Sequence, residues 1–98
     1  MQIEYKNRGL EKVCTLANEA ARKHGSKMAE IIHLRIDQIS VFDTVEMLIQ
    51  FKVGRCHTLT GDRKEQFAMD LIHPYRLIFE KRGEQIQVVR IIEITDYH

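Results

Sequence analysis

The sequence is poor in the residues that shape small secreted or repetitive proteins. Its 98 residues include two cysteines, one proline, five glycines and no tryptophan. Two cysteines are too few for a disulfide framework or a zinc finger, and so little Pro and Gly leaves no room for a flexible linker. The length suits one folded domain, residues 1–98, and not two.

Long hydrophobic runs are missing as well. The first ten residues, MQIEYKNRGL, lack the apolar segment of a signal peptide. No stretch approaches the length that a membrane-spanning helix requires. We therefore expect a cytoplasmic protein whose thiols are reduced.

An excess of one charge is also absent, because 15 Lys and Arg stand against 14 Asp and Glu. A net charge of +1 does not by itself indicate a nucleic-acid-binding protein. Locally, the segment 52–64 contains four basic residues and one acid, with a histidine among them. The basic residues are Lys52, Arg55, Arg63 and Lys64. This segment is a candidate phosphate-binding surface, and a solvated basic loop is the alternative.

Hydrophobic periodicity predicts helices in the first half of the chain. Apolar residues recur at spacings of three and four over residues 8–24 and 27–39. Gly25 separates the two segments and Ser26 can cap the second, so we expect an antiparallel helical hairpin. Asp43 and Glu46 resemble a capping box before a short third helix over residues 44–50.

The second half of the chain has the period of β-strands. Residues 66–72, 75–80 and 86–95 alternate, and short turns separate them, as in an antiparallel meander. Residues 1–5 alternate too and can pair beside the last strand. The pattern predicts an α+β fold in which the helical hairpin packs on one face of an antiparallel sheet of about four strands.

No familiar catalytic signature is present, neither a Walker loop nor GxGxxG, GxSxG or HExxH. The first candidate for chemistry is His57, which lies within the basic segment. The cations of that segment can hold a phosphate while the imidazole of His57 transfers protons. This combination suits chemistry on a phosphodiester. The alternative is a polar loop whose histidine bonds its own backbone.

Arg76 is unusual because it interrupts an apolar strand, and an unpaired buried charge is costly. It requires either a carboxylate, for which Asp70, Glu93 and Asp96 are the candidates, or a phosphate that its planar fork can bind. The strand pattern leaves both interpretations open.

The chain closes on Asp96, Tyr97 and His98, which can supply a base, an acid and a hydrogen-bonding phenol. Termini are usually inert, which is the alternative. His57, Asp96 and His98 are residue types that bind zinc, but no local ligand spacing supports a site. We therefore expect neither a metal nor another cofactor.

Together these motifs resemble the killer proteins of the HigB branch of the RelE toxin superfamily. The resemblance rests on Gly9-Leu10, on the His-x-Leu-x-Gly-Asp-Arg spacing within 55–63, on Tyr75-Arg76-Leu77-Ile78-Phe79 and on the terminal Asp-Tyr-His. It spans nearly the whole chain and implies a RelE-like microbial RNase fold. One position departs from the pattern, since Thr60 stands where Lys is common.

The resemblance also implies a function, that of a type II toxin which cuts messenger RNA in the A site of the 70S ribosome. By this resemblance His57, Arg76, Asp96, Tyr97 and His98 match the catalytic positions, and the basic residues around Arg63 match an RNA-binding rim. The reaction that the resemblance implies is metal-independent, with the ribose 2′-OH as nucleophile. The implied partner is a helix-turn-helix antitoxin of the HigA type in a heterotetramer. A ParE-like gyrase inhibitor and a non-catalytic antitoxin-binding module are the alternatives.

Overall fold

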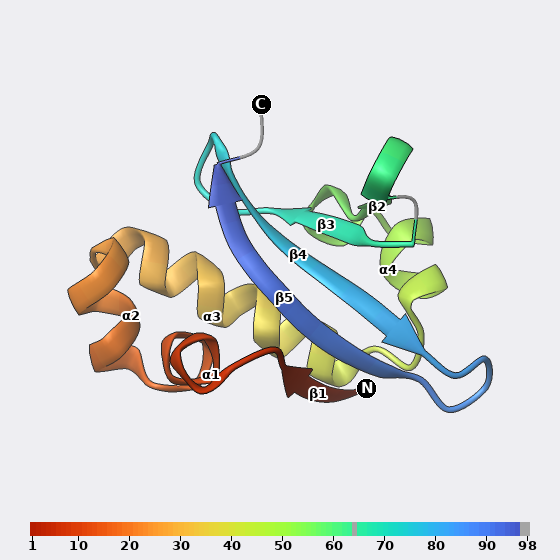
Figure 1. Ribbon diagram of the computed structural model, residues 1–98, viewed down its shortest axis with the longest axis horizontal. Helices are drawn as coiled ribbons and strands as arrows, with labels where there is room; N and C mark the ends of the chain where they lie inside the picture. Colours follow the sequence, from red (N-terminus) through yellow and green to blue (C-terminus); the bar gives the residue numbers. More distant parts are fainter. Residues whose placement is uncertain (64, 97–98) are drawn as a thin grey trace.

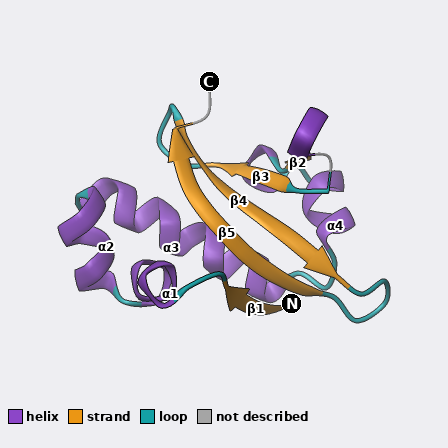
Figure 2. Ribbon diagram, in the orientation of Figure 1, coloured by secondary structure: helices purple, strands orange, loops and turns teal. Residues whose placement is uncertain are grey.

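A computed structural model describes residues 1–63 and 65–96, so Lys64, Tyr97 and His98 of the predicted site lie outside the described residues. Figures 1 and 2 show a helical layer packed against one twisted sheet. The helical elements are α1 Arg8–Thr15, α2 Ala17–His24, α3 Ser26–Val41, α4 Val45–Gln50 and the short 3-10 turns η1 Val53–Arg55 and η2 Gly61–Arg63. The strands are β1 Gln2–Tyr5, β2 His57–Thr58, β3 Phe67–Asp70, β4 Tyr75–Arg82 and β5 Val88–Asp96. No helix in the described ranges is long and apolar enough to cross a membrane.

The predicted first helix is two helices. Leu16 has an extended backbone, with φ −116° and ψ 116°, and separates α1 from α2. The break allows buried residues of α1, such as Cys14, and Ala20 of α2 to reach the same core. Gly25, at φ 86°, then reverses the chain, and α2 and α3 form the expected hairpin.

Two predicted helix caps are wrong. Ser26 is the first residue of α3, and Gly25 occupies the N-cap without a side-chain hydrogen bond. At α4 the cap is Thr44 and not Asp43, because Thr44 has the extended backbone of an N-cap and its hydroxyl accepts a hydrogen bond from the Met47 amide.

The α+β fold class is confirmed, and the sheet has one more strand than expected. Its order is β1-β5-β4-β3-β2. The two-residue strand β2 extends it beyond β3, while β1 joins β5 as expected at the opposite edge. The pairing of β1 with β5 is parallel, because the helices between β1 and the meander form a long crossover. The other pairings are antiparallel. The sheet is therefore mixed.

The main core lies between the helices and one face of the sheet. Strand alternation directs Phe67, Met69, Leu77 and Phe79 into it, and the rings of Phe67 and Phe79 stack with centroids 5.6 Å apart. Each such side chain contributes about 1.5–3 kcal/mol on full burial. A smaller cluster of Leu59, Ala68 and Ile78, with Ile92 against it, lies on the opposite face.

A β-bulge makes the last strand differ from its sequence pattern. Ile78 pairs with Glu93 whereas Phe79 pairs with Ile91, so Ile92 is an additional residue. Ile92 consequently packs on the small cluster and Ile94 on the main core, although simple alternation placed them on one face. Ile86, the first residue of the predicted strand over residues 86–95, is instead 89% exposed in the turn before β5.

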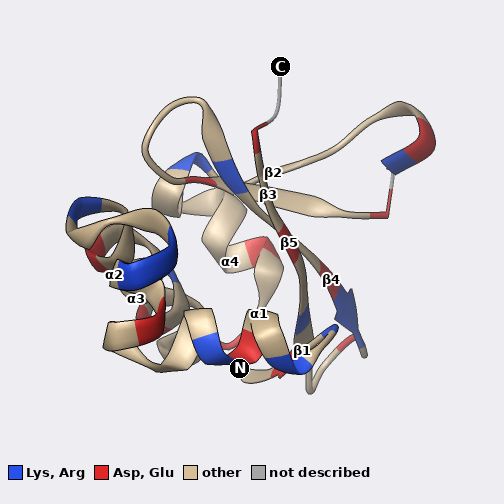
Figure 3. Ribbon diagram, turned by 60° about the vertical axis from the view of Figure 1, so that its left-hand side comes forward, with Lys and Arg blue, Asp and Glu red and all other residues tan. Residues whose placement is uncertain are grey.

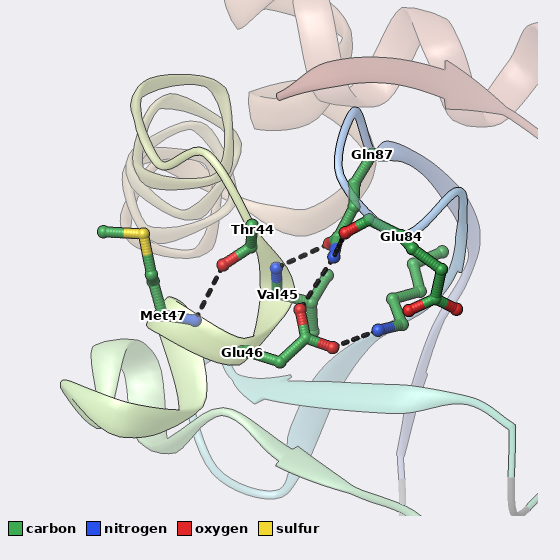
Figure 4. A network of polar contacts seen from close by, with 7 residues as sticks. Thr44, Val45, Glu46, Met47, Glu84 and Gln87 are labelled. Atoms are coloured by element: carbon green, nitrogen blue, oxygen red, sulfur yellow. Dashed lines mark hydrogen bonds and ion pairs between the residues drawn. The ribbon is translucent and has the colours of Figure 1, made fainter.

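A polar network joins the start of α4 to the β4–β5 turn, as Figure 4 shows. Gln87 is buried, and its Oε1 accepts a hydrogen bond from the Val45 amide at 2.9 Å. Its Nε2 donates to Glu46 at 2.7 Å and to the Glu84 carbonyl at 3.2 Å. Lys81 forms an ion pair with Glu46. These bonds fix the end of the sheet that lies away from the candidate site.

Candidate functional site

Strand register gathers polar residues on the sheet face opposite the helices. His57 pairs with Ala68, which pairs with Ile78, which pairs with Glu93. Cross-strand partners share a face, so these residues form a row. The neighbouring row contains Asp70, Arg76 and Thr95. The face thus places a histidine, two carboxylates and an arginine around the small apolar cluster.

Asp70 is the carboxylate partner of Arg76. Arg76 Nε lies 3.4 Å from Asp70 Oδ1, and Arg55 Nε lies 3.3 Å from Asp70 Oδ2. The Arg76 and Asp70 side chains are 26% and 24% exposed, whereas that of Arg55 is 82% exposed. Arg76 therefore has a carboxylate beside it in the folded chain, and the Asp70 carboxylate lies between two guanidinium groups.

A third guanidinium lies beneath this pair. Arg35 of α3 donates from Nε to the Asp70 carbonyl at 2.7 Å and from Nη1 to Gln38 at 3.1 Å. Burial lowers the pKa of Arg35, and the charge of Asp70 partly offsets that effect. Arg35 thus fixes the end of β3 from the helical side.

The loop that places Arg55 has a left-handed backbone at three residues, with φ 54° at Lys52, 56° at Gly54 and 54° at Arg55. Such values favour glycine and strain other residues. A Cβ on Gly54 would lie 2.6 Å from Arg35 Nε, so a side chain there would displace Arg35. Lys52, one of the predicted RNA-binding residues, is exposed on this loop.

His57 is oriented by the same loop. Its Nδ1 lies 2.8 Å from the Arg55 carbonyl oxygen, which can only accept a hydrogen bond, so Nδ1 carries the proton. Nε2 therefore holds the lone pair when the ring is neutral. Two strand spacings and two residues separate the Cα atoms of His57 and Arg76, a distance of roughly 12 Å.

Arg63 occupies the other end of the first row. Its Nη1 lies 2.5 Å from Glu93 and 3.3 Å from Gln66 Oε1. The Arg63 and Glu93 side chains are 37% and 36% exposed. The structure thus brings Arg63 to the same face as His57, and pairs it with a sheet carboxylate.

Asp96 has a different register position. It pairs with Tyr75, one step beyond the pair of Arg76 and Thr95. Alternation therefore assigns Asp96 and Arg76 to opposite faces. Tyr75 lines a cleft of about 460 Å³ on the helical side, together with His24 and Met28. The catalytic roles predicted for Tyr97 and His98 fall on residues outside the described ranges.

Neither cysteine can serve as a nucleophile in this site. Cys56 precedes His57 but belongs to the main core, and Cys14 is buried in α1. Burial raises the pKa of both thiols to about 12. Both remain protonated at neutral pH. Within residues 1–63 and 65–96, no group of three or more His, Cys, Asp and Glu side chains could hold a metal ion.

Sequence reasoning missed Arg35, and it treated Asp70 only as one possible partner. Arg35 lies three residues after Ile32 and four before Ile39, both fully buried, so it interrupts the buried stripe of α3. A charge in such a stripe was the available signal. Figure 3 shows acidic segments interspersed with basic ones, in agreement with the low net charge.

Comparisons with known proteins identify the fold. No family model matches the sequence, and no curated protein matches it either. A solved structure described as a YoeB/ParE toxin from Agrobacterium tumefaciens matches with a TM-score of 0.64, over 100% of both chains. The chain shares the fold of this neighbour. Sequence identity with this neighbour is 15%, so the likeness concerns the fold, and the activity must be argued from the site.

Proposed function

We propose that this protein is the toxin of a type II toxin-antitoxin pair, of the HigB branch, and that it is a ribosome-dependent messenger endoribonuclease. The observation that supports this most is the shared sheet face of His57 and Arg76. A proton-transfer group and a phosphate-binding cation there can contact one phosphodiester. The toxin fold of the structural neighbour agrees with the proposal.

In the proposed reaction, a base removes the proton of the ribose 2′-OH and the 2′-oxygen attacks the adjacent phosphorus. Arg76 stabilises the negative charge that develops on the phosphate oxygens. The bond to the 5′-oxygen breaks, an acid protonates that oxygen, and a 2′,3′-cyclic phosphate remains. His57 can act through Nε2, because the Arg55 carbonyl holds Nδ1. The resemblance assigns the second proton-transfer role to His98 and nucleotide positioning to Tyr97. Asp96, whose register places it on the opposite face from Arg76, has in this proposal the supporting role of helping His98.

The proposed RNA-binding rim consists of Lys52, Arg55, Arg63 and Lys64. Lys52 is exposed and Arg55 directs an 82% exposed side chain from the same loop. The cognate partner in this proposal is a helix-turn-helix antitoxin that forms a heterotetramer with the toxin in the bacterial cytoplasm.

Inducible expression in a bacterium tests the activity directly. We expect growth arrest, cleavage of messenger RNA within minutes, and rescue when the cognate antitoxin is co-expressed. The matched variants are His57→Gln, which should be non-toxic, and His73→Gln, which changes an exposed histidine in the β3–β4 turn and should remain toxic. Loss of DNA supercoiling without messenger cleavage would instead support a ParE-like gyrase inhibitor.

A purified translation system tests the mechanism. Cleavage should require ribosomes and should persist when transition metals are chelated while free magnesium is kept sufficient for the ribosome. Restoration of a lost activity only by zinc or manganese would contradict the metal-independent reaction. A chain lacking residues 96–98 should fold and bind antitoxin but lose at least about a hundredfold in rate. Full activity of that truncated chain would refute the catalytic role of the tail.

A further inference from the structure

The two ion pairs of Asp70 are loose. Their distances of 3.3 and 3.4 Å exceed the roughly 2.7–2.9 Å of a strong charged hydrogen bond, and each uses an arginine Nε. Asp70 Oδ1 is buried and has no hydrogen bond with any residue in the described ranges. The Arg55 side chain is 82% exposed. The carboxylate thus neutralises its neighbours without a tight, bidentate contact.

The surroundings of Asp70 are strongly cationic. Arg55 and Arg76 contact its carboxylate and Arg35 contacts its backbone carbonyl, so three guanidinium groups adjoin one carboxylate. Arg35 donates hydrogen bonds to the Asp70 carbonyl and to Gln38, and these bonds keep its guanidinium in place. An anion that approached Arg55 would be attracted by its exposed guanidinium and opposed by the charge of Asp70.

We propose that Asp70 is an internal competitor for phosphate, which holds Arg55 in the free protein and yields it when a phosphate group binds. Asp70 therefore sets the affinity for phosphate of the arginine cluster, which consists of Arg35, Arg55 and Arg76. The inference rests on the proposed function only in naming the RNA backbone as the natural source of that phosphate. The cluster itself is defined by the contacts of the folded chain.

Inorganic phosphate is the first probe, titrated by calorimetry into the full chain and its variants. Asp70→Asn keeps the shape and removes the charge, and it should tighten phosphate binding by about threefold to tenfold. Glu84→Gln is the control, because it changes the net charge by the same amount in the β4–β5 turn, roughly 20 Å along β4 from Arg76. It should change phosphate binding less than twofold. In the Arg55→Gln background the gain from Asp70→Asn should largely disappear.

A merely structural role for Asp70 predicts the opposite result, weaker binding in Asp70→Asn. Binding no tighter than that of Glu84→Gln would overturn the inference. If Asp70→Asn does not fold, nuclear magnetic resonance of the unmodified protein decides. The Arg55 Nε signal should shift on saturation with phosphate while the Arg35 Nε signal stays, and an unmoved Arg55 signal refutes the exchange.

A single-stranded oligoribonucleotide, titrated in parallel, separates this inference from the proposed function. Tighter phosphate binding in Asp70→Asn without any RNA binding or cleavage supports the competitor role and contradicts the ribonuclease. RNA cleavage combined with unchanged phosphate affinity supports the ribonuclease and contradicts the competitor role.

Discussion

A methyl group at residue 54 is expected to destabilise the protein through Arg35. In Gly54→Ala the new Cβ would lie 2.6 Å from Arg35 Nε and 2.9 Å from its Cδ, so the guanidinium must move. Movement weakens its bond to the Asp70 carbonyl, and a hydrogen bond from a charged group is worth about 1.5–3 kcal/mol. The backbone, at φ 56°, adds about 1–2 kcal/mol for any L side chain. The total is a loss of roughly 2.5–5 kcal/mol.

Gly61→Ala is the matched control for this substitution. Gly61 has φ 67°, and its added Cβ would meet nothing within 4 Å. Only the backbone cost applies there, and we expect a loss of about 1–2 kcal/mol. The measurement is the free energy of unfolding in urea at 25 °C for both variants and the parent chain.

A double-mutant cycle then tests the cause. In an Arg35→Ala background the Cδ and Nε atoms that the new Cβ would meet are gone, so Gly54→Ala should cost only about as much as Gly61→Ala. Equal costs for Gly54→Ala and Gly61→Ala in the parent chain would refute the argument, because the contact between residue 54 and Arg35 would then impose no constraint.

Three further predictions concern catalysis, pH and thiol reactivity. His57→Gln should lower the rate of messenger cleavage at least about a hundredfold. The melting temperature of this variant should stay near that of the parent, since His57 is only partly buried. Cleavage at the parent rate by His57→Gln would exclude His57 from catalysis. The pKa of Glu46 is lowered from 4.5 to about 2, chiefly by its hydrogen bond with Lys81, so the contribution of this carboxylate to stability is complete above about pH 4.5 and is lost as the pH falls to about 2. The stability difference between the parent and Glu46→Gln should therefore shrink over that window in melts at successive pH values, and a difference that does not change with pH would contradict this. Because burial raises the pKa of the Cys14 and Cys56 thiols to about 12, native protein at pH 8 should resist alkylation by iodoacetamide and react only on unfolding, and rapid labelling of the native state would show that the core opens.

Local pattern predicted most of the element order, although not the break at Leu16 or the short strand β2. The spacing of apolar residues predicted the hairpin around Gly25, and alternation predicted the strands β3 and β4. These features follow from periods of 3.6 and 2 residues, which depend on near neighbours in the chain. The cap at Thr44 was misplaced by one residue because neighbouring polar residues offer similar capping groups.

Features that depend on register could not be obtained in this way. The bulge at Ile92 transfers one side chain to the opposite face, and nothing in the alternating sequence marks it. The parallel pairing of β1 with β5 likewise depends on where the helices direct the returning chain.

For the candidate site, residue type and spacing were enough to identify side chains with suitable chemistry, such as His57 and Arg76. The partners of these side chains follow from the packing of the folded chain. Arg35, Arg55 and Arg76 meet at Asp70 because α3, a left-handed loop and two paired strands converge there. Arg35 and Asp70 are 35 residues apart in the chain. Contacts across such separations depend on the packing of whole elements, whereas residue type and spacing report only what each segment can contribute.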